Sequence, residues 1–476
     1  MAVDERWGDE TADLLRATAE QAIDFLSGLP DRPVTAQATL GELRRALAGE
    51  LPEHGEAADS VVSQLVANGQ PGVIGIPGPR FFGFVIGGSL PAALAADWLT
   101  STWDQNAGIY AAGPAAAVVE EVAAAWLLDL FDLPRESSVG FTTGCQMAHV
   151  TALAAARRSV LLRHGWDVEQ RGLAGAPQIR VLAGDEVHVT IPIALQMLGL
   201  GSSNVERVPV DEQGRMRPDA LRELLVGGDA DAPTIVCVQV GNVNTGACDP
   251  VDEIADIVRE REGAWLHVDG AFGLWARVSP KLRHLARGVE RADSWASDSH
   301  KWLNVPYDSG LVIVRDTAAH RAAMMLMAAY LIPAGGDERD PSNFVPEFSR
   351  RARGFAVYAA LRSLGRSGVT ELVERCSGLA RRMADRLAAE PRVEVLNEVV
   401  LNQVLVRFGN DDALTADVVR RVQEDGTCWL SGSRWQGRGV MRISVSNWST
   451  TDADADVSVE AILRCWRETQ SASAPA

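Results

Sequence analysis

Three short segments of the chain carry side chains that could take part in one chemical site. Asp269 ends an apolar run at 265–268 and precedes a glycine, which places a carboxylate at the end of a predicted strand. Lys301 follows after enough chain for one crossover helix and another strand, so both side chains can reach the same edge of a sheet. At 139–146 a predicted strand breaks at Gly144 and opens a helix, whose unpaired backbone N–H groups can bind a phosphate.

Each segment has an ordinary structural explanation when it is taken alone. An aspartate at a strand end often caps a turn or a helix, and a strand–glycine–helix connection is more often plain packing than an anion site. Together, however, the segments offer an amine for an aldehyde, an acid for a ring nitrogen and a cradle for a phosphate. These groups bind pyridoxal 5'-phosphate, whose enzymes use a lysine Schiff base and an acidic partner for the pyridinium nitrogen.

Two histidines lie close to these segments in the sequence. His300 precedes Lys301, and a cationic neighbour or partial desolvation lowers the pKa of a lysine amine and so favours Schiff-base formation. His188 follows the predicted strand at 179–183 and could stack on the pyridine ring. The alternative for His188 is a structural histidine with satisfied hydrogen bonds.

Lysine is rare in this chain. Of its 45 basic residues only Lys281 and Lys301 are lysines, and the other 43 are arginines. Nucleotide composition could produce this bias. Because a guanidinium group cannot be deprotonated in a protein, a lysine in such a chain is nevertheless a candidate for amine chemistry. Lys281 lies in a predicted solvated turn at 279–283, where arginine would serve equally well, so the neighbours of Lys301 make it the candidate.

The composition excludes several classes of protein. A net charge of −18 disfavours a sequence-independent grip on nucleic acid or on an anionic membrane surface. The six cysteines include no C-x-x-C pair, so we predict neither a metal site nor a disulfide framework. The start of the chain lacks an apolar signal region, and the longest apolar stretch, at 115–130, contains two glutamates. We therefore expect a soluble, cytoplasmic protein.

The pattern of the chain predicts an α/β protein with three parts. Residues 1–90 show helical periodicity but cannot form a core of their own, so this arm is expected to pack on a second subunit. Residues 91–367 alternate strands and helices, which favours a mostly parallel sheet covered on both faces, and residues 368–476 form a smaller α+β unit with a disordered tail at 471–476. We predict strands at 139–143, 179–183, 234–240, 265–269, 310–315, 393–396, 403–408 and 440–445, and helices at 12–26, 40–51, 146–163, 192–198, 251–261, 371–387 and 417–424.

From about residue 79 to 451 the sequence resembles the group II pyridoxal-phosphate-dependent amino-acid decarboxylases, which have the aspartate-aminotransferase fold (fold type I). Residues 267–271 (HVDGA) resemble the H-V-D-A-A motif of the family, and residues 299–302 (SHKW) resemble its P-H-K-W motif. The segments 79–82 (PRFF), 292–294 (ADS) and 350–353 (RRAR) are also similar to the family pattern.

The resemblance implies a role for each matching position. Lys301 would hold the cofactor covalently, Asp269 would pair with the pyridine nitrogen, and His188 and Ala271 would lie against the two faces of the ring. The phosphate would be bound by residues that include Gly144, Cys145, Gln146 and His300. The family forms homodimers with active sites at the subunit interface, which would explain the N-terminal arm.

Three segments depart from the family pattern. The S-G-G-[ST] phosphate turn of the family is TGCQ at 143–146, and its G-T-T segment is GNV at 241–243, so Asn242 stands where a threonine beside the cofactor is expected. The loop at about 335–348 lacks the tyrosine that is thought to protonate the substrate carbon in decarboxylases, and Phe344 is its only aromatic residue before Phe348. In related plant and insect enzymes the loss of this tyrosine converts decarboxylation into oxidative formation of an aldehyde.

We therefore predict a pyridoxal-phosphate-dependent carboxy-lyase that converts an L-amino acid into its amine and carbon dioxide. Four aromatic residues could line an apolar wall for an aromatic or large apolar substrate, or could simply be core: Phe81, Phe82, Phe84 and Trp103. The enzymatic alternatives are an oxygen-dependent aldehyde synthase and a carbon–carbon lyase on the same cofactor. A cofactor-free scaffold is the non-enzymatic alternative, and it would be colourless when purified.

Overall fold

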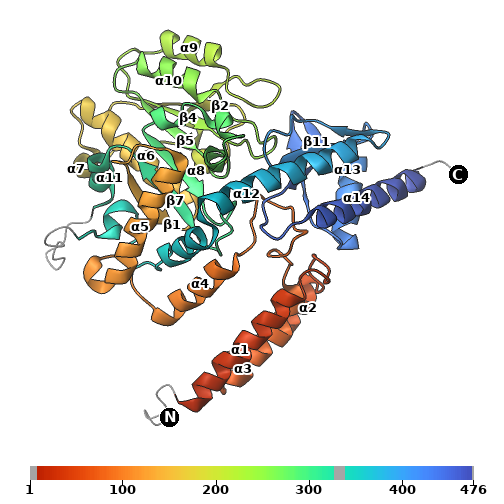
Figure 1. Cartoon of the computed structure of the whole chain (residues 1–476). Coiled ribbons are helices and arrows are strands. Elements are labelled where there is room, and N and C mark those ends of the chain that lie inside the picture. Colours follow the sequence, from red (N-terminus) through yellow and green to blue (C-terminus); the bar gives the residue numbers. More distant parts are fainter. Residues whose placement is uncertain (1–7, 326–337, 474–476) are drawn as a thin grey trace.

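The computed structural model describes residues 8–325 and 338–473 of the chain. Its centre is a seven-stranded sheet in the order β1-β7-β6-β5-β4-β2-β3 (Figure 1). β7 is antiparallel to both of its neighbours, and the other pairs are parallel, so six strands point the same way. The strands are β1 (Ser138–Thr142), β2 (Arg180–Gly184), β3 (Val205–Val208), β4 (Thr234–Gln239), β5 (Trp265–Asp269), β6 (Ser294–Asp298) and β7 (Gly310–Val314).

Helices cover both faces of this sheet, as the alternating pattern predicts. On β4, Ile235 and Cys237 pack into one apolar cluster while Val236 and Val238 pack into the other, because successive side chains point to opposite faces. One cluster includes residues of α6 (Cys145–Arg163) and α8 (Thr190–Met197), and the other includes residues of α5 (Pro114–Phe131), α9 (Pro218–Gly227) and α10 (Val251–Arg259). The large unit also contains α4 (Pro91–Trp103), α7 (Val168–Arg171) and α11 (Thr317–Met324).

The C-terminal part is a four-stranded antiparallel sheet in the order β10-β11-β9-β8. Its elements are β8 (Val393–Val395), β9 (Gln403–Phe408), α13 (Asp412–Asp425), β10 (Ser431–Trp435), β11 (Arg438–Ser444) and α14 (Asp452–Ser473). A long helix, α12 (Gly354–Ala388), leads into it and is interrupted by non-helical backbone at Gly365, so the boundary expected after residue 367 falls inside this helix. The tail prediction is wrong for 471–473, which continue α14 because its preceding turns pack on the core; residues 474–476 lie outside the described part.

Three helices at the start of the chain, α1 (Asp9–Ser27), α2 (Leu40–Leu47) and α3 (Ala58–Gly69), project from the body as an arm (Figure 1). None of them contains a buried residue, although large apolar side chains such as Leu15 and Leu65 are present. The arm therefore has an apolar surface that the described residues of this chain do not cover. Within the described residues, no helix combines the length and the apolarity that a membrane crossing requires.

Candidate active site

The strand directions bring the predicted site residues to one edge of the large sheet. β1, β5 and β6 run in the same direction, so their carboxyl ends lie at this edge. Asp269 is the last residue of β5, Asp298 is the last residue of β6, and the chain turns at Gly144 after β1 to begin α6. Lys301 follows β6 directly, which explains how it reaches the same edge as Asp269.

The amine of Lys301 is buried against a carboxylate. Its Nζ lies 3.0 Å from Oδ2 of Asp298, and only 18% of the lysine side chain is exposed. Burial is the largest single influence and lowers the pKa of Lys301, but Asp298, Cys145 and Asp269 together outweigh it and raise the pKa above the ordinary value. Desolvation, one of the two factors that can lower a lysine pKa, is therefore present at Lys301 but is outweighed. The amine is an ammonium here, and it must lose a proton before it can act as a nucleophile.

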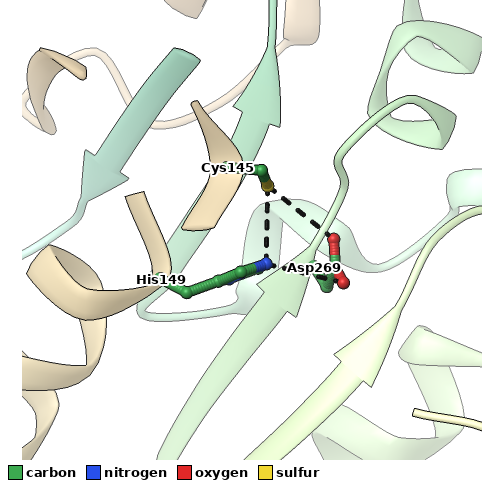
Figure 2. A group of neighbouring side chains, drawn as sticks. All are labelled: Cys145, His149 and Asp269. Atoms are coloured by element: carbon green, nitrogen blue, oxygen red, sulfur yellow. Dashed lines mark hydrogen bonds and ion pairs between the residues drawn. The ribbon is translucent and has the colours of Figure 1, made fainter. Parts of the chain in front are cut away.

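Asp269 is held in place from three directions, and Figure 2 shows two of them, the contacts with Cys145 and His149. Its Oδ1 accepts a hydrogen bond from the backbone N–H of Ala271 at 3.1 Å and lies 3.9 Å from the thiol sulfur of Cys145. Its Oδ2 lies 3.5 Å from Nε2 of His149. Burial alone would raise the pKa of Asp269, but the favourable interactions with His149, His188 and Lys301 outweigh it and hold the pKa well below the usual range. The carboxyl group therefore stays ionised, as a partner for a protonated ring nitrogen must.

Cys145, His149 and Asp269 also have the residue types of a metal site. Their ligand atoms lie within 4.8 Å of one another, and all three residues are buried. Burial and the charges of Asp298 and Asp269 raise the pKa of the Cys145 thiol well above its usual range, whereas a metal-binding cysteine is a thiolate. The prediction that the chain binds no metal stays a prediction.

His188 lies after β2 and is half-buried at the same edge. Its Nδ1 is 2.8 Å from Oγ1 of Thr190, and the backbone oxygen of Thr190 accepts a hydrogen bond from the side chain of Gln146 at 3.3 Å. Burial lowers the pKa of His188 despite the nearby Asp269, so the imidazole is neutral at pH 7. A neutral ring that is fixed by a hydroxyl is suited to stacking on an aromatic cofactor.

The turn at the start of α6 is closely packed against the residues around Lys301. A Cβ at Gly310 would collide with the backbone of Gly144, and a Cβ at Gly144 would lie 3.2 Å from Cε1 of His300. The backbone N–H of Cys145 donates to Oδ1 of Asp298 at 2.6 Å, so this donor is already engaged. The phosphate contacts expected of this turn stay predictions, with Gly144 and Gln146 as the open donors of the first turn.

His300 and Asn242 are each held by their own neighbours. Nδ1 of His300 accepts a hydrogen bond from the backbone N–H of Ser309 at 3.3 Å, and its ring stacks on Tyr307 with a centroid distance of 4.3 Å. Oδ1 of Asn242 accepts from two backbone N–H groups of its own loop, those of residues 244 and 245. In the described part of the chain, Nδ2 of Asn242 has no hydrogen-bond partner, and its contact with a cofactor stays a prediction.

The donor set of this edge fits the expected cofactor. It combines an amine, an ionised carboxylate, a neutral imidazole and the start of a 19-residue helix. Among the described residues, the buried hydroxyls of Ser299 and Ser309, on either side of Lys301 in the sequence, have no hydrogen-bond partner. Unpaired buried hydroxyls are costly, and a phosphate would satisfy them.

Most of the chain matches the model of one protein family. The model of the pyridoxal-dependent decarboxylase conserved domain matches residues 41–408. The chain belongs to this family. As a pyridoxal-dependent decarboxylase, it is a carboxy-lyase that uses pyridoxal 5'-phosphate to act on an amino acid, which confirms the predicted enzyme class and cofactor.

Similar proteins match this decarboxylase over nearly its whole length. Tryptophan decarboxylase 1 of Oryza sativa subsp. japonica is 28% identical over 92% of this chain and 90% of its own. The aromatic-L-amino-acid decarboxylase of Bacillus atrophaeus is 27% identical over 93% of both chains, and 4-hydroxyphenylacetaldehyde synthase of Rhodiola rosea is 27% identical over 88% of both. The crystal structure of Oryza sativa TDC with PLP and tryptamine matches with a TM-score of 0.91, at 25% identity over 98% of this chain and 99% of that one.

Three residues of this edge were given no role in the sequence analysis: Asp298, His149 and Thr190. Asp298 stands three residues before Lys301, and its position at the end of an unpredicted strand hid it. His149 lies one helical turn after Cys145, a spacing that places both side chains on the same face of a predicted helix. That spacing was the only signal available for His149.

Proposed function

We propose that this decarboxylase converts an aromatic L-amino acid into its amine and carbon dioxide, and that Lys301 and Asp269 carry the reaction. The observation that supports these roles is the meeting of a buried amine and a buried, ionised carboxylate at one sheet edge. Pyridoxal 5'-phosphate, when bound, supplies the electron sink for the electrons that the departing carboxylate leaves behind. The protein supplies the attachment, the orientation and the proton transfers.

Each residue of the edge has a part in this proposal. Lys301 attaches the cofactor, and Asp298, at 3.0 Å, is placed to take the proton that its ammonium must lose. Asp269 keeps the ring nitrogen protonated, because its carboxylate is the ionised form. His188 and Ala271 would lie against the ring when the cofactor is bound, and the remaining predicted residues would bind the phosphate or its surroundings: Gly144, Cys145, Gln146, His300 and Asn242.

An aromatic surface near Lys301 supports an aromatic substrate. The segment before Gly87 runs along the backbone of the lysine loop, since a Cβ at Gly87 would collide with the carbonyl oxygen of Lys301. Phe84, three residues earlier, is 54% exposed and packs against Trp429 with a centroid distance of 5.2 Å. Phe81 and Phe82 are buried, whereas Phe84 and Trp103 are both exposed; of these two, Phe84 lies on the segment that runs beside the lysine loop, so it is the candidate to meet a substrate.

Replacing Phe84 by alanine is expected to raise KM for aromatic L-amino acids by about tenfold with a smaller change in kcat, because the contact binds the substrate side chain rather than the reacting atoms. Steady-state kinetics on phenylalanine, tyrosine and tryptophan measure this. Val226→Ala is the matched control, since Val226 is an exposed apolar residue of α9. Equal kinetics for the Phe84 variant and this control would contradict the aromatic subsite.

The products distinguish the proposed reaction from aldehyde synthesis. The missing tyrosine of the loop at 335–348 and the similarity to an aldehyde synthase favour aldehyde synthesis as the second candidate. In this loop residues 335–337 lie outside the described part, and Phe344 is buried edge-on against His320. The proposal predicts one amine for each carbon dioxide from an aromatic amino acid. Hydrogen peroxide and ammonia in equal amounts would establish the second candidate, and no turnover of any aromatic amino acid would refute the substrate class.

We also propose that the enzyme is a homodimer and that the arm packs on the partner. The exposed leucines of α1, α2 and α3 support this, because large apolar surfaces left uncovered are typical of interfaces. Sedimentation should give twice the mass of one 51.1 kDa chain. Leu15→Glu with Leu65→Glu should shift it towards the monomer, whereas Val226→Glu should not. A monomeric parent protein would refute the proposal.

The cysteines support the cytoplasm as the compartment of this enzyme. All six are free and buried, and none is paired in a disulfide. Unpaired cysteines are usual in a reducing compartment, whereas proteins of oxidising compartments commonly contain disulfides.

A further inference from the structure

A series of buried polar side chains in contact with one another ends at the carboxylate of Asp269. The indole nitrogen Nε1 of Trp265 donates to Oγ of Ser294 at 2.8 Å, and this oxygen lies 2.8 Å from Nδ1 of His267. Nε2 of His267 lies 2.9 Å from Nδ1 of His149, whose Nε2 lies 3.5 Å from Oδ2 of Asp269. The four side chains that lead to Asp269 in this series are each 5% exposed or less: Trp265, Ser294, His267 and His149.

The first member of this series favours one direction for all the hydrogen bonds. An indole nitrogen can only donate, so Ser294 accepts from Trp265 and is free to give its own proton to Nδ1 of His267. Burial lowers the pKa of His267 to about 3, so its ring is neutral and, when Ser294 donates to Nδ1, carries its one proton on Nε2. This proton is donated to Nδ1 of His149, and the proton of His149 is therefore on Nε2, facing Asp269.

The opposite direction is disfavoured by two contacts. It would make Ser294 accept from both Trp265 and His267, and the contacts found for this oxygen in the described chain would leave its own proton without an acceptor. It would also turn the lone pair of His149 Nε2 towards the carboxylate of Asp269 at 3.5 Å, where two acceptors would repel, although the thiol of Cys145 at 3.4 Å could then donate to this nitrogen. The two directions thus predict different protonated nitrogens on the same two histidines.

We propose that His149 is a positioning residue, fixed by Trp265, Ser294 and His267 as an N–H donor that orients the carboxylate of Asp269 before the cofactor binds. The backbone N–H of Ala271 holds Oδ1, and His149 faces Oδ2, so the two oxygens have separate partners. This inference rests on the role proposed above for Asp269. It adds that the carboxylate is oriented by side chains that begin at Trp265, at the opposite end of β5, before any cofactor is present.

Nitrogen NMR of the full chain labelled with ¹⁵N-histidine tests the direction, and it can be done before and after removal of the cofactor. The eight histidines give few signals, and His149→Asn and His267→Asn assign the two that matter. Both rings are expected to show a protonated Nε2 and an unprotonated Nδ1 in the cofactor-free protein at pH 7. A proton on Nδ1 of His149, a doubly protonated ring, or binding of one zinc ion per chain with loss of the Nε2 proton would overturn the proposal.

Two serines of β6 provide a matched pair of variants. Ser294→Ala removes the donor to His267 and is expected to weaken cofactor affinity by about tenfold, to shift the absorption of the bound cofactor and to mix the tautomers of His149. Ser297→Ala makes the same change at an equally buried position whose hydroxyl has no partner in the described part of the chain, and it should change none of these. Equal effects of the two variants would overturn the proposal.

A double-mutant cycle separates positioning from general damage to the strand. An asparagine at position 149 has an N–H donor that does not depend on the hydrogen bonds of Trp265, Ser294 and His267. Ser294→Ala should therefore no longer affect cofactor affinity in the His149→Asn background. A loss of the same size in both backgrounds would overturn the proposal. The tautomers are measured without cofactor, so a wrong role for Asp269 would instead show as an unchanged cofactor environment after Asp269→Asn.

Discussion

Replacing Lys301 by alanine is expected to abolish the covalent attachment of the cofactor and to lower kcat by on the order of 10³-fold or more. Lys301→Arg should fail equally, because a guanidinium group cannot give up its proton to become a nucleophile. Absorption spectra of the purified proteins and carbon dioxide release from an aromatic amino acid measure the two effects. The fold should persist, since among the described residues the lysine side chain makes a single ion pair, with Asp298.

Lys281 offers the matched control for this prediction. It is the other lysine of the chain, and its side chain is 78% exposed with its Nζ 2.6 Å from Glu374, so its predicted position on an exposed turn is confirmed. Lys281→Ala and Lys281→Arg should leave both the colour and the turnover unchanged, because an exposed ion pair contributes little to stability. A Lys301→Ala protein that still carries the cofactor covalently would contradict the assignment of the lysine.

Replacing Asp269 by asparagine is expected to lower kcat by about 10²–10³-fold while the cofactor stays attached to Lys301. The side chain keeps its shape but loses the charge that holds the ring nitrogen protonated, so the electron sink is weakened and the attachment is not. The variant should therefore remain coloured with a shifted absorption maximum. This combination distinguishes Asp269 from Lys301, whose loss removes the attachment itself.

Asp249→Asn provides a control for the general cost of changing a buried aspartate. Asp249 accepts hydrogen bonds from the backbone N–H groups of Met216 and Gln239, each at 2.7 Å, and burial raises its pKa to about 7. Asparagine loses one of the two acceptors, so we expect a lower free energy of unfolding, by about 1–3 kcal/mol, with unchanged cofactor absorption. If Asp249→Asn and Asp269→Asn had the same effect on kcat, the specific role of Asp269 would be refuted.

Strongly patterned elements were predictable from the sequence alone. The strand at 265–269 is predicted with the bounds it has in the structure, because five mostly apolar residues end at an aspartate–glycine pair. The Gly144 turn and the helix after it were predictable for a similar reason, since a glycine separates a β-branched run from a long helical period. Parallel strands bring these ends together, so the meeting of Asp269 and Lys301 followed from the fold class.

The parts of the fold and of the site that the sequence did not predict depend on contacts between residues far apart in the chain, which a local sequence pattern does not contain. β6 has the sequence SWASD, in which small polar residues replace the β-branched ones, and it forms because the sheet buries it on both sides. Asp298, at the end of β6, was therefore not placed beside Lys301, and its effect on the pKa of the lysine could not be predicted. His149 and His267 lie more than a hundred residues apart, and only the packing of α6 on β5 shows that they touch.

Peptide mapping of the borohydride-reduced holoenzyme tests the central claim most directly. Reduction makes the bond between the cofactor and its lysine permanent, and the chain contains two lysines from which to choose. The account predicts that the mass of the reduced cofactor is found on the peptide that contains Lys301 and that the peptide with Lys281 is unmodified. Cofactor found on Lys281, or on no lysine at all, would contradict it.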